Sequence, residues 1–180
     1  VYIGRNLNYA DYSSSYPFSK YPQYYAYSAF YSNKDTLAKV TLGPLCTELT
    51  DYLFYKNSAI TLMALSNVNK IGNSTFEECN KLTTLNLGNN LEKVSNRSFY
   101  NCTNITKLTF PASTTEIGNY AFYNCNSVTE VTVGAGLKSI GSYSFYGCKS
   151  FTALMLPNSF TTMGESAFEG CSKRTIAKLG

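Results

Sequence analysis

The sequence contains no histidine and no tryptophan, and charged residues make up only 14% of its 180 residues. Without histidine, the chain lacks the commonest general base and the commonest imidazole metal ligand. No histidine is available to activate a serine or cysteine nucleophile, and no phosphate-binding GxxxxGK[ST] motif occurs. These absences predict a protein that is not an enzyme and that uses no cofactor and no metal.

The chain also lacks long runs of one kind of residue. The longest basic run is the pair Lys173-Arg174, and the net charge is only +4. No segment approaches the roughly 20 apolar residues that cross a bilayer. We therefore expect no nucleic-acid partner and no membrane insertion.

What the sequence does contain is a repeat. A phenylalanine followed three residues later by cysteine recurs every 23 residues, at Phe76, Phe99, Phe122, Phe145 and Phe168. Phe54 continues the series upstream with one residue fewer, and Tyr31 continues it once more. A fixed period of this length is the signature of a solenoid, in which each coil covers the apolar edge of the next.

The other columns of the repeat predict its secondary structure. Nine and eleven residues after each phenylalanine stand apolar residues that flank one polar or small residue, as in Leu108-Thr109-Phe110, which is typical of a strand with one buried face. Glycine, proline or serine then predicts a turn. The apolar positions of residues 117–125 predict one short helical or 3-10 turn. The sequence thus predicts a right-handed solenoid with a parallel β-sheet on one side, and short helical turns and extended segments on the other.

These motifs resemble the BspA-like leucine-rich repeat family. Its units combine an apolar-Thr-x-apolar-x-apolar strand with Ile-Gly-x-x-Ala-Phe-x-x-Cys, which residues 128–133 and 140–148 follow nearly position for position. The resemblance covers about residues 31–175. It implies a bacterial cell-surface or secreted protein that takes part in adhesion and binds a host or bacterial surface protein.

The repeat also suggests how the chain is organised. Residues 1–30 are predicted to hold a partial repeat and a Tyr-rich insertion or N-terminal cap, and residues 31–180 a leucine-rich repeat solenoid of about six coils. The two parts are expected to form one continuous domain. Because the strand pattern starts at Val1, we expect this chain to be a fragment of a longer protein.

Five of the six cysteines share one column, and an odd number cannot pair completely. Neighbouring side chains in such a column point the same way, which does not suit a disulfide. We expect buried structural thiols there, and a small core residue at Cys46. The recurring phenylalanine is predicted to form the core. The tyrosine after it is predicted either to line the outer face or to pack over the turn with its hydroxyl in water.

Binding is expected where side chains leave the sheet, because packing does not dictate those residues. The candidate binding face comprises Lys39, Thr41, Leu62, Thr84, Asn86, Lys107, Thr109, Glu130, Thr132 and Met155. The alternative is that this face is simply solvated.

The Tyr-rich segment, where the repeat is interrupted, is either a cap over the first coil or an aromatic surface for a protein or a glycan. Its candidate residues are Tyr12, Tyr16, Tyr21, Tyr24, Tyr25 and Tyr27. The leading prediction is a non-enzymatic protein-binding or adhesion module. The alternatives are a glycan-binding module that uses the Tyr-rich segment, and a passive structural spacer.

Overall fold

The computed structural model describes residues 2–5, 30, 33–172 and 175–178. All elements assigned in these residues are strands. They are β1 (Tyr2–Arg5), β2 (Thr41–Leu45), β3 (Glu48–Leu49), β4 (Leu62–Ala64), β5 (Lys70–Ile71), β6 (Thr84–Asn86), β7 (Lys93–Val94), β8 (Lys107–Phe110), β9 (Glu116–Ile117), β10 (Glu130–Val133), β11 (Ser139–Ile140), β12 (Ala153–Leu156), β13 (Thr162–Met163) and β14 (Thr175–Lys178).

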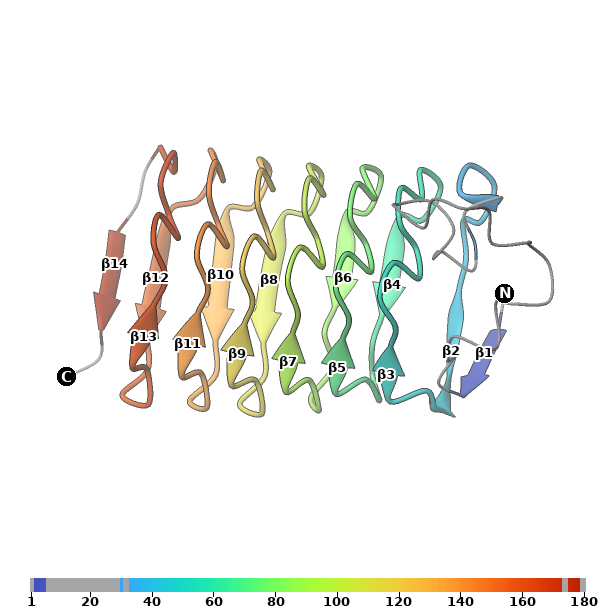
Figure 1. Cartoon of the computed structure of the whole chain (residues 1–180), viewed down its shortest axis with the longest axis horizontal. Coiled ribbons are helices and arrows are strands. Elements are labelled where there is room, and N and C mark those ends of the chain that lie inside the picture. The colour runs from blue at the N-terminus through green and yellow to red at the C-terminus, as the bar shows by residue number, and fades with distance from the viewer. Residues whose placement is uncertain (1, 6–29, 31–32, 173–174, 179–180) are drawn as a thin grey trace, which may run out of the picture.

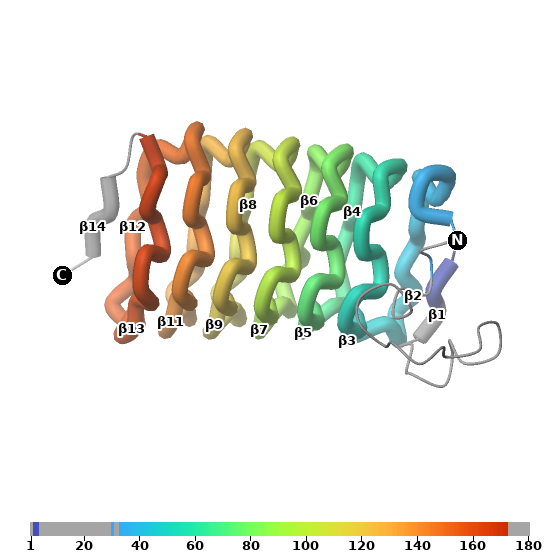
Figure 2. Tube along the Cα trace, turned by 45° about the horizontal axis from the view of Figure 1, so that its top comes forward, coloured from blue at the N-terminus to red at the C-terminus, as the bar shows by residue number. Residues whose placement is uncertain are grey.

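The chain winds into a parallel β-solenoid, as the repeat predicts (Figure 1). Odd-numbered strands from β3 to β13 run up the near side, and even-numbered strands from β4 to β12 run down the far side, while the chain advances from right to left. This sense of winding is right-handed. The tube in Figure 2 shows the coils stacked side by side along one axis.

The side with the longer strands is divided into three pieces. β1 pairs with β2, β4 pairs with β6, and β8, β10, β12 and β14 form a four-stranded sheet. All pairs are parallel, and their registers follow the repeat, as in Glu130 opposite Lys107. In the first coil the strand starts at Thr41, two residues later in the repeat than β4, β6, β8, β10 and β12. This late start accompanies the break between β2 and β4, and a second break lies between β6 and β8.

The opposite side holds the short extended segments that the sequence predicts. β3, β5, β7, β9, β11 and β13 have two residues each and form a six-stranded parallel sheet. Outward-facing charges pair across it: Lys93 contacts Glu116 at 2.9 Å and Lys70 contacts Glu48 at 3.9 Å.

In residues 117–125, where the sequence predicts one short helical or 3-10 turn, the structure has no helical turn. Residues 117–125 instead form consecutive turns in which Tyr120 and Asn124 have left-handed backbones, with φ of 56° at both. The amides of Tyr120, Phe122 and Asn124 donate to carbonyls of the following coil at 2.7–2.9 Å. A helix would direct these amides to its own preceding turn, so the hydrogen bonds between coils replace the helical ones.

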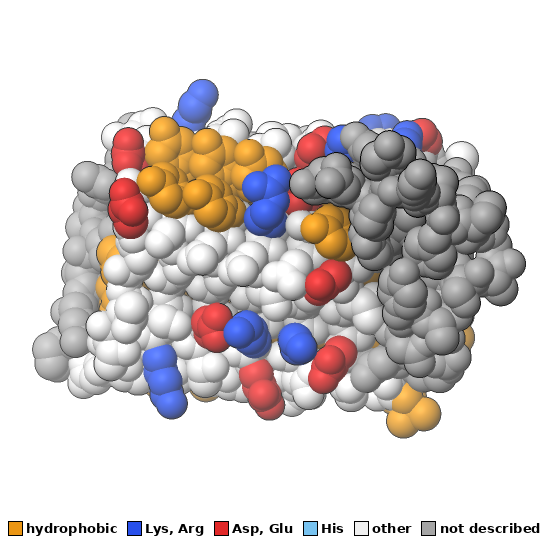
Figure 3. Space-filling model, in the orientation of Figure 1, with side chains coloured by type: hydrophobic (Ala, Val, Ile, Leu, Met, Phe, Trp, Pro, Cys, Tyr) orange, Lys and Arg blue, Asp and Glu red, His pale blue; other side chains and the backbone are white. Residues whose placement is uncertain are grey.

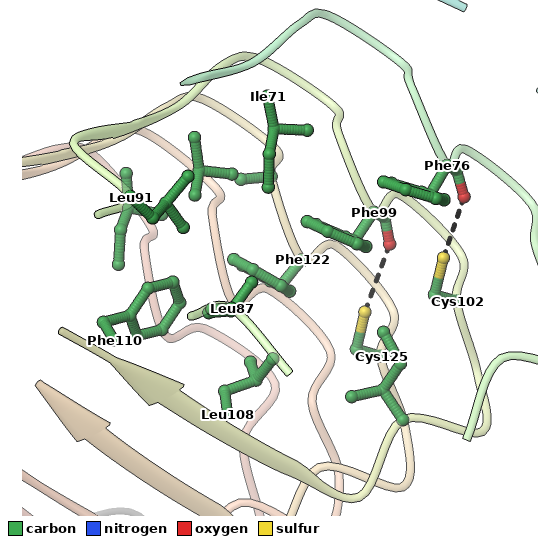
Figure 4. Packing of buried hydrophobic residues seen from close by; sticks show 14 of the residues in the cluster. Ile71, Phe76, Leu87, Leu91, Phe99, Cys102, Leu108, Phe110, Phe122 and Cys125 are labelled. Atoms are coloured by element: carbon green, nitrogen blue, oxygen red, sulfur yellow. Dashed lines mark hydrogen bonds between the residues drawn. The ribbon is translucent and has the colours of Figure 1, made fainter. Parts of the chain in front are cut away.

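The phenylalanine column forms the core (Figure 4). Phe76, Phe99, Phe122 and Phe145 are fully buried, and neighbouring rings lie parallel with centroids 5.0–5.2 Å apart. The stack continues at its N-terminal end through Phe54 to Phe30, at 5.5 Å. Tyr31, the predicted continuation, lies outside the described residues.

The cysteine column forms a second ladder beside the phenylalanines. Each of the five thiols at positions 79, 102, 125, 148 and 171 donates to a phenylalanine carbonyl of an earlier coil, as Cys102 does to Phe76 at 2.9 Å (Figure 4). Asn57 takes this place in an earlier coil, and its side-chain amide donates to Leu37. Cys46 is buried in the core, as expected. The described cysteines thus satisfy backbone carbonyls that the core encloses.

An asparagine ladder joins the coils near the surface. The side-chain oxygen of Asn73 accepts the amide of Asn96, that of Asn96 accepts the amide of Asn119, and that of Asn119 accepts the amide of Ser142, at 2.8–3.2 Å. Asp51 begins the ladder by accepting the amide of Asn73. Each link gives one backbone amide a hydrogen-bond partner in the preceding coil and so helps to fix the spacing of two coils.

Candidate functional site

The structure places the ten residues of the predicted binding face on the surface of the side with the longer strands. All ten are exposed, and Leu62 and Met155 expose 56% and 53% of their area. Nine lie on strands β2, β4, β6, β8, β10 and β12, whereas Lys39 lies just before β2. The structure therefore brings the columns together as one extended face, and whether that face binds a partner stays a prediction.

Two of these residues contact each other. Lys107 and Glu130 are opposite in the β8–β10 register and form an ion pair of 2.9 Å with both side chains more than half exposed. Such a pair contributes about 0–1 kcal/mol to stability. Its two charges therefore serve mainly as surface features, which a partner of matching charge would meet.

A groove of about 560 Å³ opens where the sheet is broken between β2 and β4. Three residues of the predicted face, Lys39, Thr41 and Leu62, line it. The apolar side chains of Val40, Leu42 and Ala64 also contribute to its walls. The groove thus combines an apolar lining with hydroxyl and ammonium groups at its mouth.

The turns carry an ordered aromatic surface that the sequence predicts only in part: the tyrosine after the phenylalanine is expected on the outer face or over the turn, whereas no prediction covers the tyrosine two residues before it. We call it the tyrosine platform: Tyr100, Tyr120, Tyr123, Tyr143 and Tyr146. Tyr100, Tyr123 and Tyr146 stack at 4.8 and 4.9 Å, and Tyr120 and Tyr143 stack at 5.0 Å, all within 5° of parallel. All five are half-buried. Figure 3 shows a flat hydrophobic patch on this part of the near side. The signal was present, since these tyrosines recur one residue after and two residues before the phenylalanine.

Charged residues bound the platform. Arg97 lies over the Tyr100 ring at 3.9 Å and is held by Glu77, which it contacts at 2.6 Å and 3.1 Å. At the other end the Tyr143 hydroxyl donates to Glu165. The Glu165 carboxylate raises the pKa of Tyr143, and partial burial raises that of Tyr123. Both hydroxyls consequently stay protonated well into the alkaline range.

Burial also raises the pKa of the thiols Cys79, Cys102, Cys125 and Cys148 well above the usual range. A thiol is a nucleophile and a metal ligand only as the thiolate. These four groups are therefore structural donors. The described residues contain no group of three or more metal-ligating side chains, and no helix among them is suited to cross a membrane.

The candidate aromatic surface predicted in the Tyr-rich segment is distinct from the tyrosine platform. Tyr12, Tyr16, Tyr21, Tyr24, Tyr25 and Tyr27 all lie outside the described residues. The cap and contact-surface hypotheses for this segment both stay predictions.

Solved structures with the same architecture come from several bacteria. A leucine-rich repeat protein of Eubacterium ventriosum is 30% identical, with a TM-score of 0.72 over 82% of this chain and 39% of that one. A leucine-rich cell surface protein of Faecalibacterium prausnitzii is 25% identical, with a TM-score of 0.72 over 77% of this chain and 38% of that one. The chain therefore spans well under half the length of either structure. The Treponema pallidum leucine-rich repeat protein, 23% identical with a TM-score of 0.61 over 76% of this chain and 67% of that one, shares the fold.

No curated protein matches the sequence closely. The family match is extensive: the family described as the BspA type leucine-rich repeat region matches in six copies, over residues 3–129 and 92–179. Because these matches include the phenylalanine, cysteine and strand columns described above, the chain belongs to the BspA type leucine-rich repeat family.

Proposed function

We propose that the chain is a non-enzymatic protein-binding module of a bacterial cell-surface or secreted protein, and that it binds a host or bacterial surface protein through the strand face. The observation that carries this proposal is the groove between β2 and β4, which opens on that face and is lined by exposed Leu62. Exposed apolar side chains that surround a recess are typical of protein interaction sites. The Faecalibacterium relative is described as a cell surface protein, which supports the location.

The charge pattern of the face gives the first test. Exchanging Lys107→Glu with Glu130→Lys keeps the intramolecular ion pair but inverts its direction on the surface. We expect unchanged thermal stability and a loss of partner affinity of about tenfold or more, measured by biolayer interferometry on surface proteins and whole bacterial cells that bind the parent chain. Unchanged affinity for every such partner would exclude the β8–β10 part of the face from the binding site.

The groove gives the second test. Leu62→Glu places a carboxylate among the apolar groove walls, so we expect it to weaken binding more than the charge exchange does. Leu45→Glu is the matched control, because Leu45 is even more exposed, at 71%, and does not line the groove. Equal losses for both variants would indicate a general effect of negative charge and would argue against the groove.

Two alternatives from the sequence remain. Deleting residues 9–29, which spares Phe30 in the core stack, would abolish glycan binding if the Tyr-rich segment carried it, and would leave binding by the strand face intact. A passive spacer would bind none of the proteins, cells or glycans.

A further inference from the structure

The tyrosine platform and the asparagine ladder lie next to each other because their residues are adjacent in the sequence. Asn119 directly precedes Tyr120, Ser142 directly precedes Tyr143, and Asn96 directly precedes Arg97, which lies over Tyr100. Figure 3 shows the patch as flat rather than hollowed. The rings stack on one another along the solenoid axis, so they turn mainly their edges and hydroxyls to solvent. This surface is regular, rigid and amphipathic, and it lies on the turns rather than on the strand face.

We propose that the tyrosine platform, with the side-chain amides of Asn96 and Asn119, binds an uncharged linear polysaccharide of equatorially linked pyranoses that runs along the solenoid axis. This is a second site, on a different surface from the one assigned to a protein partner. Its argument rests on spacing, hydrogen-bonding groups and charge.

The spacing of the platform discriminates between kinds of linear polymer. Equivalent tyrosines recur every 4.8–5.0 Å. An extended polypeptide presents side chains to one face about every 6.6 Å, at about 3.3 Å per residue, and falls out of register within two coils. A chain of equatorially linked pyranoses, as in cellulose, advances by nearly the same step per sugar as the solenoid does per coil. It therefore presents one sugar to each coil.

The hydrogen-bonding groups of the surface are preorganised for hydroxyl-rich ligands. The side-chain oxygens of Asn96 and Asn119 are held by amides of the next coil, which fixes the orientation of the remaining NH₂ groups. Both asparagines are exposed. Within the described part of the chain, no hydrogen bond engages the hydroxyls of Tyr123 and Tyr146. Phenolic hydroxyls donate and accept, as sugar hydroxyls do.

The charges around the platform favour a neutral ligand. Arg97, the cation that lies over the Tyr100 ring at one end of the platform, is already paired with the buried carboxylate of Glu77. Two exposed acids, Glu165 and Glu169, stand at its other end. A polyanion such as a nucleic acid or an acidic polysaccharide would be repelled by these two carboxylates.

Affinity electrophoresis of the whole chain tests this proposal with three soluble polymers. Hydroxyethylcellulose is neutral and equatorially linked, carboxymethylcellulose has the same backbone with negative charges, and dextran is neutral with another linkage geometry. We expect hydroxyethylcellulose to retard the chain most. The triple variant Tyr100→Phe, Tyr123→Phe and Tyr146→Phe keeps the ring stack and removes three hydroxyls, so we expect about tenfold weaker retardation with unchanged thermal stability.

The same experiment separates this site from the protein-binding face. The Lys107→Glu, Glu130→Lys variant should be retarded like the parent chain, since it does not alter the platform. The proposal is overturned if hydroxyethylcellulose fails to retard the parent chain, if dextran retards it equally, or if the triple phenylalanine variant is retarded as strongly as the parent.

Discussion

Single residues in this fold act on a neighbouring coil rather than on their own. Each phenylalanine ring packs between the two rings next to it, and each column thiol donates to a carbonyl of an earlier coil. The asparagine at position 57 also donates to a carbonyl of an earlier coil, although to that of Leu37 rather than to one of the phenylalanine column. The recurrence of cysteine thus has a structural cause, because a small side chain that donates one hydrogen bond fits a fully buried column.

The buried thiols predict a dependence of stability on alkaline pH. Burial raises the folded-state pKa of Cys79, Cys102, Cys125 and Cys148 above the unfolded value of about 9. Below that value both states hold the protons and the stabilisation is fully present. As the pH rises above it, only the unfolded thiols ionise, so each buried thiol lowers the unfolding free energy by about 1.4 kcal/mol per pH unit.

Urea unfolding between pH 8.5 and about 10 measures this slope, and Cys125→Ala provides the comparison. Removing one titrating group should make the variant's slope shallower by about 0.8 kcal/mol per pH unit on average over this range, approaching about 1.4 kcal/mol per pH unit at its upper end, whatever its stability at neutral pH. Parallel profiles for parent and variant would show that Cys125 does not contribute to the alkaline loss.

At the scale of the element, the turns differ most from what the sequence predicts. The spacing of the apolar residues in residues 117–125 indicates that one face of this segment is buried. A helical turn and a pair of tight turns would both place these residues on one face. Left-handed residues two positions before and two positions after each phenylalanine decide between them. The second of these positions holds Gly147 and Gly170 in the last coils, and asparagine at 101 and 124, which are the residues that tolerate this conformation best.

Glu78 lies two residues after Phe76, at the second left-handed position, with φ of 61°. A glutamate in this conformation destabilises the fold relative to glycine. Its ion pair with Lys56, at 3.7 Å, is weak compensation for a strained backbone. We expect Glu78→Gly to raise the unfolding free energy by about 1 kcal/mol, measured by urea denaturation. Gly147→Glu is the reciprocal variant and should lower it; a loss of stability in both would contradict this account of the turn.

Strands and core were predictable because burial imposes a period on the sequence. Leu108, Val131 and Leu154 recur since each must enter the same apolar interior. The residues of the tyrosine platform and the asparagine ladder recur with the same 23-residue period, yet they do not show the alternation of apolar and polar residues that identifies a buried face. Their order comes from contacts between coils, such as Tyr123 on Tyr146, which become visible only when the coils are stacked.

At the scale of the whole molecule, each coil contacts mainly its two neighbours, so the number of coils can change without altering the fold. Excising residues 123–145 joins Phe122 to Tyr146 and removes one complete period of 23 residues. We expect a folded solenoid with a melting temperature several degrees lower and a smaller denaturant m-value, because less surface is buried.

Excising residues 124–145 is the matched control. It leaves one extra residue between phenylalanine and cysteine, which displaces the thiol from its carbonyl. Circular dichroism and urea unfolding compare the two, and we expect the second deletion to be much less stable. Similar stability for both would show that the period does not set the register of the coils.

The hydrogen bonds between coils run along the solenoid axis, and this direction has a mechanical consequence. Pulling the two ends of the solenoid apart puts the same tension on every interface between coils, so the weakest interface opens first while the others hold. Between β2 and β4 the side with the longer strands contributes no pairing, so the β3–β5 pair is the strand pairing that resists such a force there. Each coil that opens releases about 75 Å of extended chain. Under tension the molecule would lengthen in steps of one period, and would limit the force on whatever it connects.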